Sequence, residues 1–200
     1  MTQRELWNDR YRDRGAVWGV GPNVFVADRL AHLEPGRALD LGCGQGRNAI
    51  WLAKQGHTVT AVDVSDVATA QGAEIAAAAG VEVDFITGDL LTWEPPDASF
   101  DLVLLAYIQA PPEIREELHA KAGRALAPGG RVVVVAHHSD NLENGVGGPP
   151  MPEVLFDEDM LAADFAGLEV VENSRVLRRV ENDDVGGDAI DVIFIGRRAF

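Results

Sequence analysis

The segment that most constrains the fold of this chain is residues 38–47, ALDLGCGQGR. A short apolar stretch in it runs directly into three closely spaced glycines, Gly42, Gly44 and Gly46. A strand, a tight glycine turn and a helix in this order are typical of an open α/β sheet that binds a nucleotide-like ligand above the carboxyl ends of its strands. A dinucleotide site would need G-x-G-x-x-G, but the last position of that pattern falls on Arg47. The spacing therefore favours a ligand that places no phosphate on the turn.

Acidic residues accompany the three strands predicted around this turn. Asp40 lies in the first strand, Asp63 closes a β-branched strand over residues 57–64, and Asp89 follows a third strand over residues 81–86. A carboxylate about 20 residues beyond the turn suits a ribose diol, because it accepts two hydrogen bonds side by side. Each feature also has an ordinary interpretation, with the glycines as turn formers, Asp63 beside a helix N-cap and Asp89 in a turn. Their joint order at consecutive strand ends favours the ligand site.

The run LDLGCGQGRNAIWLAKQGHTVTAVDVS, residues 39–65, resembles class I S-adenosylmethionine (SAM) methyltransferases, and within them the tellurite-resistance and thiopurine-type branch. The resemblance extends from about residue 5 to residue 198. It implies SAM as the cofactor, with Asp89 at the adenine amino group and the Leu90 backbone amide at a ring nitrogen. The cofactor-binding residues expected on this basis are Tyr11, Trp18, Asp40, Gly42, Cys43, Gly44, Gly46, Asn48, Asp63, Val64, Asp89, Leu90 and Ala106.

A helical cap is expected over residues 1–36. Trp7 and Tyr11 are four residues apart and share one helix face, and Asn23 has the chemistry of an N-cap for a second helix. The helix with Trp7 and Tyr11 resembles the N-terminal cap of methyltransferases in which the cap closes over SAM. This resemblance implies that Tyr11 and Trp18 lie near the cofactor. The ordinary alternative is that these aromatic side chains only pack the cap onto the sheet.

The remaining pattern and the resemblance imply a Rossmann-like, doubly wound α/β sheet of seven strands, mostly parallel, with a C-terminal antiparallel hairpin. Helices are expected over residues 113–127, with His119 at the surface, and over residues 157–165. The later strands are expected at residues 100–106, 131–136, 168–180 and 189–198.

Length and composition predict one methyltransferase domain over residues 1–200, because 46% hydrophobic residues suit a single core. After the cap, residues 37–138 form the expected SAM-binding core, and residues 139–200 form a lid loop, a helix and the hairpin. The 32 acidic and 17 basic residues give a formal charge of −15. Such a charge repels nucleic acids and anionic membranes, so neither is expected as a partner.

The single cysteine, Cys43, excludes an internal disulfide, and we interpret it as a small buried residue of the glycine turn. The sequence shows neither the apolar core of a signal peptide nor a membrane span, so we expect a cytoplasmic protein. The five histidines have no ligand spacing with acidic residues, and no metal site is expected.

The acceptor is expected at the ends of the fourth and fifth strands, near Tyr107, Ile108, His137 and His138. Either histidine could act as a general base, or the pair could be a hydrogen-bonded structural feature. In-line methyl transfer needs mainly orientation, and a thiol of pKa about 8.5 needs little help from a base. The resemblance implies a small-molecule acceptor with a sulfur, selenium or tellurium nucleophile, although the chain departs from those relatives over residues 137–152.

Three alternatives stay open at this point. The chain could methylate oxygen or nitrogen of a small metabolite, or bind SAM or S-adenosylhomocysteine (SAH) without catalysis. A nucleotide-dependent oxidoreductase is the third, suggested by the glycine turn alone.

Overall fold

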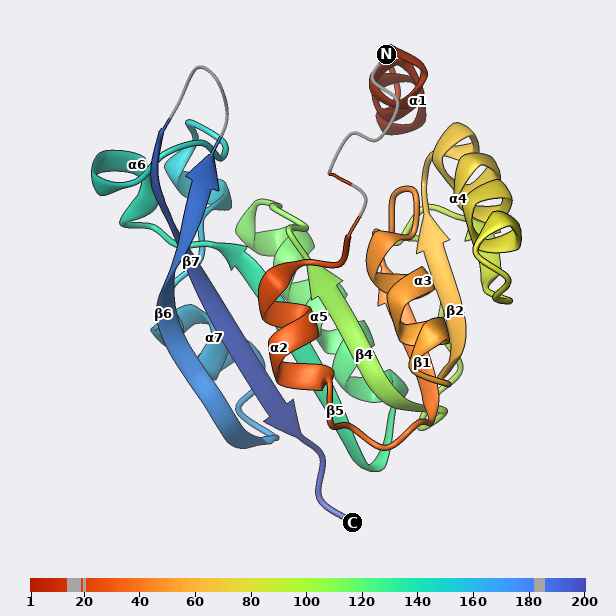
Figure 1. Ribbon diagram of the computed structural model, residues 1–200. Helices are drawn as coiled ribbons and strands as arrows, with labels where there is room; N and C mark the ends of the chain where they lie inside the picture. The colour runs from red at the N-terminus through yellow and green to blue at the C-terminus, as the bar shows by residue number, and fades with distance from the viewer. Residues whose placement is uncertain (14–18, 20, 182–185) are drawn as a thin grey trace.

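A computed structural model describes residues 1–13, 19, 21–181 and 186–200. Its centre is a seven-stranded sheet in the order β3-β2-β1-β4-β5-β7-β6, and helices lie on both faces of it (Figure 1). The first five strands of this order are parallel, and β7 runs antiparallel to both β5 and β6. The predicted doubly wound sheet with a terminal hairpin is confirmed. The strands are β1 (Arg37–Leu41), β2 (Thr58–Asp63), β3 (Asp84–Thr87), β4 (Phe100–Ala106), β5 (Leu126–His137), β6 (Glu169–Glu181) and β7 (Gly186–Arg197).

The helices begin where side chains can cap them. Asn23 accepts hydrogen bonds from the N–H groups of Phe25 and Val26, and Ser65 and Asp157 cap later helices in the same way. The helices are α1 (Gln3–Asp13), α2 (Val24–Leu30), α3 (Arg47–Lys54), α4 (Asp66–Ala78), α5 (Pro112–Ala125), α6 (Asn141–Asn144) and α7 (Glu158–Asp164), with a 3-10 turn at Pro152–Val154. None of the helices in the described ranges is long and apolar enough to cross a membrane.

The valines of β5 show how the sheet is buried on both faces. Val132 and Val134 belong to one apolar cluster, with residues of α5 and α7, whereas Val133 and Val135 belong to a second cluster with residues of α2 and α3. Figure 1 shows α2 and α3 in front of the sheet and α5 and α7 behind it. Alternate side chains of β5 therefore pack against the helices on opposite faces of the sheet, as expected for a central strand.

The first helix belongs to a cap that rests on α4. The Asn8 side chain donates to Asp66 Oδ1 at 2.7 Å and accepts from Ser65 Oγ at 2.7 Å. Both partners follow directly after β2, so these contacts bring α1 to the carboxyl edge of the sheet. The cap therefore lies where the glycine turn of residues 42–46 also lies.

The prediction that His119 is a surface residue is wrong. Its side chain is buried, its Nδ1 lies 2.7 Å from Asp164 Oδ2, and its ring stacks on Phe165 with 4.8 Å between centroids. Arg115, one turn earlier, donates to the same carboxylate at 2.7 Å. Because Asp164 in α7 supplies a partner for both, the polar face of α5 turns inward and the apolar Ile114 is left partly exposed.

This buried cluster predicts an acid-sensitive contribution to stability. Burial alone would raise the pKa of Asp164, but hydrogen bonds from His119 and Arg115 outweigh it and lower the pKa. The stabilisation is therefore present above the unfolded value of about 3.9 and is lost as the pH falls through the lower folded value. We expect Asp164→Asn to reduce the free energy of unfolding by about 2 kcal/mol at pH 7, with the difference shrinking toward pH 3. Urea unfolding at both pH values measures this, and an equal loss at both would contradict the role of the charge.

Candidate functional site

The turn between β1 and α3 is built from glycines that no other residue could replace without strain. Gly42, Gly44 and Gly46 have φ values of +65°, +56° and +75°. A Cβ on Gly44 would lie 2.5 Å from the hydroxyl oxygen of Tyr11, and one on Gly46 would lie 2.5 Å from the ring of Phe85. The glycines therefore serve both the left-handed backbone and the close approach of neighbouring side chains.

Asp63, at the end of β2, holds this turn. Its Oδ2 accepts the Gly44 N–H at 2.8 Å and its Oδ1 accepts the Ser65 N–H at 2.9 Å. Burial raises the pKa of Asp63, although both backbone donors act in the opposite direction. The carboxylate lies against the turn at the edge of the sheet.

Asp40, in β1, is a buried carboxyl group that is only partly satisfied. Its side chain is 1% exposed, and Oδ2 has no hydrogen-bond partner among the described residues. Burial raises the pKa of Asp40 to about 7, in spite of the positive charge of Arg47 nearby. A buried carboxyl oxygen without a partner is a costly feature for folding and suits a site that receives a polar, positively charged ligand.

Asp40 should therefore limit the stability of the ligand-free protein. Between the unfolded pKa of about 3.9 and the folded value of about 7, the unfolded chain ionises while the folded chain keeps its proton. Stability contributed by the bound proton is thus lost as the pH rises through this range. We expect Asp40→Asn to raise the melting temperature at pH 8 and to leave it nearly unchanged at pH 4. Thermal scans of ligand-free protein test this, and a lower melting temperature at pH 8 would contradict it.

The segment after β3 lies next to the glycine turn. Asp89 is exposed and its Oδ1 accepts the Leu91 N–H at 3.0 Å, while the preceding Gly88 donates its N–H to the Asp63 carbonyl at 2.9 Å. A Cβ on Gly42 would lie 3.9 Å from the nearest Leu90 side-chain carbon. Lys121 also donates to the Leu90 carbonyl at 3.1 Å. The turn, Asp63 and the Asp89 segment thus meet at one edge.

Several other residues that the sequence predicts to bind the cofactor also make contacts that stabilise the fold. Asn48 Oδ1 accepts the Asn23 N–H at 2.9 Å, which fastens the start of α2 to α3. The Val64 carbonyl accepts from Arg4 Nε at 3.1 Å. Burial raises the pKa of the Cys43 thiol, so the thiol stays neutral as a small residue of the turn. Ala106 ends β4 at the same edge, and Trp18 lies outside the described residues.

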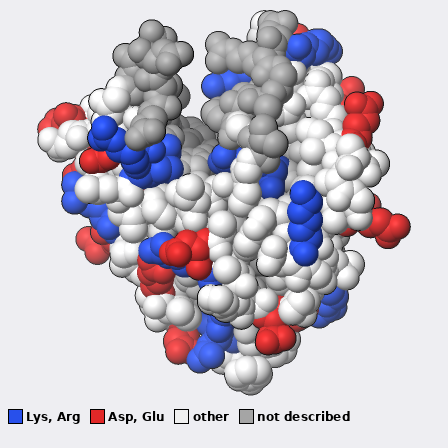
Figure 2. Space-filling model, in the orientation of Figure 1, with Lys and Arg blue, Asp and Glu red and all other residues white. Residues whose placement is uncertain are grey.

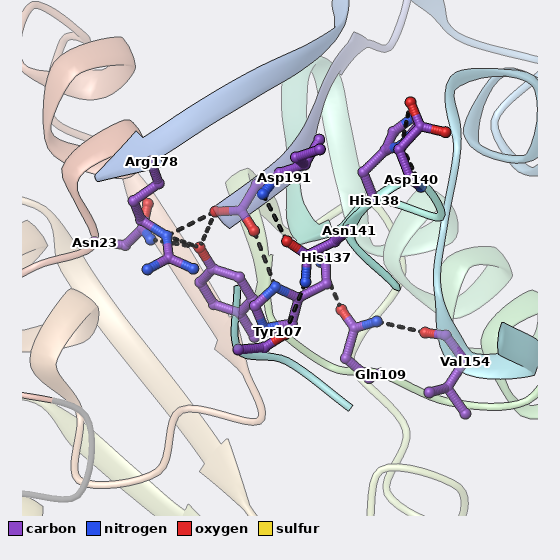
Figure 3. A network of polar contacts seen from close by, with 12 residues as sticks. Asn23, Tyr107, Gln109, His137, His138, Asp140, Asn141, Val154, Arg178 and Asp191 are labelled. Atoms are coloured by element: carbon purple, nitrogen blue, oxygen red, sulfur yellow. Dashed lines mark hydrogen bonds and ion pairs between the residues drawn. The ribbon is translucent and has the colours of Figure 1, made fainter. Parts of the chain in front are cut away.

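A network of polar side chains occupies the acceptor side of this edge (Figure 3). The Tyr107 hydroxyl donates to Asp191 Oδ2 at 2.7 Å and accepts from Arg178 Nε at 3.0 Å. The other oxygen of Asp191 lies 3.0 Å from His137 Nδ1. Tyr107 has a φ of +59°, a strained value that directs its side chain into the network. Asp191 is fully buried, so its charge depends on these partners.

The electrostatics of the network keep it organised. Burial alone would raise the pKa of Asp191, but the close contact with His137 and the hydrogen bonds from Arg178 and Tyr107 lower it. Burial and the Asp191 charge raise the pKa of Tyr107, so the phenol stays a hydrogen-bond donor. Asp191 is thus a fixed anion that orients three side chains.

The two adjacent histidines differ in their partners. His138 Nδ1 accepts the Asp140 N–H at 2.9 Å, and its Nε2 lies 2.9 Å from Glu158 Oε2. Both ring nitrogens of His138 therefore have partners within the protein, the arrangement of the hydrogen-bonded structural feature that the sequence offered as an alternative. His137 uses Nδ1 toward Asp191, and its Nε2 has no partner among the described residues.

The start of the predicted lid, residues 139–152, is fastened to the sheet. Asn141 Oδ1 accepts the Ile190 N–H at 2.7 Å, and Asn141 Nδ2 donates to the Gly147 carbonyl at 2.8 Å. After this loop, the Val154 carbonyl accepts a hydrogen bond from Gln109 Nε2, and Gln109 Oε1 accepts the His137 N–H. This segment covers the ends of β5 and β7 as an anchored loop.

Comparisons with known proteins show what the chain is similar to. Residues 38–130 match the methyltransferase domain family. Thiocyanate methyltransferase 1 of Arabidopsis thaliana is 26% identical over 181 residues, 86% of this chain and 78% of the relative. Probable thiol methyltransferase 2 of the same plant is 24% identical over 176 residues, 84% of this chain and 76% of the relative.

Among solved structures, the N-methyltransferase NodS of Bradyrhizobium japonicum WM9, in complex with SAH, has a TM-score of 0.73 and 18% identity, and the match covers 98% of this chain and 97% of that chain. TehB from Haemophilus influenzae has a TM-score of 0.75 and 18% identity, covering 96% and 67%.

The matched methyltransferase domain includes the glycine turn and the acid-ended strands, and the chain is a SAM-dependent methyltransferase. Its residues fit SAM: the buried, unpartnered oxygen of Asp40 can face a cation, and the carboxylate of Asp63 lies beside the glycine turn.

Proposed function

We propose that this enzyme transfers the methyl group of SAM to a soft nucleophile, an atom of sulfur, selenium or tellurium, on a small molecule. The observation that carries the proposal is the meeting of the glycine turn, Asp63 and the Tyr107–Asp191–His137 network at one edge of the sheet. The relatives named as thiocyanate and thiol methyltransferases support a sulfur acceptor.

In the proposed complex the residues of the chain bind and orient. The Asp63 carboxylate accepts hydrogen bonds from the two ribose hydroxyl groups. Asp89 accepts a hydrogen bond from the adenine amino group, and the Leu90 N–H donates one to a ring nitrogen. Tyr11 of the cap covers the turn, as its contact with Gly44 suggests. Bound SAM supplies a methyl group on a positively charged sulfur, which is a good leaving group. The remaining task is to exclude water and align the acceptor behind the methyl carbon.

We assign His137 as the general base for acceptors that carry a proton. Its Nδ1 faces the Asp191 carboxylate, which favours the tautomer with Nε2 free to accept. As the sulfur–methyl bond to the acceptor forms and the bond to the cofactor breaks, the thiol proton passes to His137 Nε2. The products are a methyl thioether and SAH.

The test uses two acceptors that differ in whether they carry a proton. Thiocyanate has none to lose, whereas a neutral alkyl thiol must lose one. Mass spectrometry should detect methylated products of both with the unaltered protein. His137→Asn should slow the thiol reaction several-fold, because a thiol can also ionise without the base, and should leave the thiocyanate reaction nearly unchanged. Folded protein that binds SAM yet methylates no sulfur, selenium or tellurium acceptor would contradict the proposal.

The His137–Asp191 pair also favours a second candidate, methylation of a hydroxyl group, because a hydroxyl acceptor depends on a base more than a thiol does. A relative named 2-heptyl-1-hydroxyquinolin-4(1H)-one methyltransferase, from Mycobacteroides abscessus, is 29% identical over 138 residues, 66% of this chain and 60% of the relative. Adding hydroxylated aromatic compounds to the same assay compares the two candidates directly.

A further inference from the structure

Of the three guanidinium nitrogens of Arg178, Nε makes the contacts with the Tyr107–Asp191–His137 network. Its Nε donates to Asp191 Oδ2 at 2.7 Å and to Tyr107 at 3.0 Å, and its guanidinium carbon lies 5.5 Å from the centre of the Tyr107 ring. Within the described part of the chain, its two terminal nitrogens have no hydrogen-bond or ion-pair partner, and its side chain is 25% exposed. The side chain is therefore held firmly while its terminal N–H groups stay available.

The neighbouring arginines of β6 are different. Arg175 pairs with Asp140 at 3.0 Å, and Arg179 pairs with Asp188 at 3.6 Å, both at exposed positions. Because side chains alternate along a strand, Arg178 points to the opposite face from Arg179. Figure 3 shows its guanidinium group beside Asn23 and the Tyr107 ring, with the terminal nitrogens directed away from Asp191.

The surroundings of Arg178 are more positive than the chain as a whole. The half-buried Arg47 of α3 lies close enough that, after burial, the charge of Arg178 contributes to lowering the pKa of Arg47. Figure 2 shows several Lys and Arg side chains in the upper half of this face, with most Asp and Glu side chains lower or at the periphery. In a chain of formal charge −15, two arginines therefore lie near each other, each with an aspartate nearby, Asp191 or Asp40.

We propose that the terminal N–H groups of Arg178 bind a carboxylate, or an oxyanion of similar shape, that the methyl acceptor carries close to its nucleophilic atom. A planar guanidinium group whose orientation is already fixed matches two carboxylate oxygens without further ordering. Arg178 and His137 contact opposite oxygens of the same Asp191 side chain, so one short acceptor can reach both. The inference rests on the proposed function and specifies its substrate class.

The experiment compares 3-mercaptopropionate with its uncharged isostere, 3-mercaptopropionamide. We expect kcat/KM to favour the carboxylate about 10-fold to 100-fold, the range for a charge-assisted bidentate pair. Arg178→Gln should reduce this ratio to near one, and Arg178→Lys should leave an intermediate ratio. The ratio is measured within each variant, so a lower fraction of folded protein does not change it. Arg179→Gln, which removes the same charge on the other face, should keep the ratio of the unaltered protein.

A ratio near one in the unaltered protein, or an equal ratio in Arg178→Gln, would overturn the inference while the proposed function stands. If neither of these thiols is methylated, a binding measurement decides the inference, and the acceptor panel described above decides the proposed function separately. Calorimetric titration of 3-mercaptopropionate into the protein with SAH should show affinity that Arg178→Gln lowers at least tenfold. Equal affinity in both proteins would overturn the role of Arg178.

Discussion

Replacing Asp63 with alanine is expected to reduce the affinity for SAM by about 10²-fold to 10⁴-fold. The proposed ribose site uses both carboxylate oxygens, and two hydrogen bonds to a charged group contribute about 3 to 6 kcal/mol together. The same oxygens hold the Gly44 and Ser65 N–H groups at 2.8 and 2.9 Å in the ligand-free protein. The substitution therefore also loosens the turn on which SAM would lie.

Calorimetric titration with SAM measures this loss, and a thermal scan of each protein shows that it is folded. Asp84→Ala is the matched control, because Asp84 is an exposed aspartate at the start of neighbouring β3 and removes the same charge. It should bind SAM like the unaltered protein. Unchanged affinity in Asp63→Ala would reject the ribose assignment.

Gly44→Ala is expected to abolish measurable SAM binding and to lower the free energy of unfolding by about 2 to 5 kcal/mol. A left-handed backbone costs an alanine about 1 to 2 kcal/mol, and overpacking costs about 1 to 3 kcal/mol more. The new Cβ would lie 2.5 Å from the Tyr11 hydroxyl and would push the cap off the turn. Both the cofactor surface and the cap are then displaced.

Gly80→Ala is the control that separates the cost of the left-handed backbone from the cost of the close contact with Tyr11. Gly80 has a φ of +71°, but a Cβ there would meet nothing within 4 Å. This control should lose only the backbone part of the stability and keep normal SAM binding. If Gly44→Ala behaves no worse than Gly80→Ala in unfolding and titration, the close contact between the cap and the turn is not significant.

Local chemistry explains which parts of the structure the sequence predicts well. The bounds of β4 are predicted at residues 100–106 because apolar β-formers there end abruptly at the turn before α5. The N-cap Asn23 is predicted because a cap needs only one side chain and the next three residues. The third strand is shorter than predicted, since β3 begins at Asp84 and not at residue 81.

Partners that are distant in sequence explain what sequence reasoning missed. Asp164 buries His119 from 45 residues away, and Asp191 meets Tyr107 from 84 residues away. The spacing of apolar residues within one helix or strand cannot reveal such pairs. One signal was available, because Asp191 interrupts the apolar run AIDVIFI of β7, and a charged residue in a buried strand needs a partner. Arg178 carried no comparable signal in the exposed edge strand.

The most direct test of the account is a crystal structure of the protein with SAH. We predict that both ribose hydroxyl groups lie within about 3.2 Å of the Asp63 carboxylate, with the adenine beside Asp89 and the homocysteine part over residues 42–46. An adenosyl group bound elsewhere, with Asp63 still engaged only by Gly44 and Ser65, would contradict the proposed site.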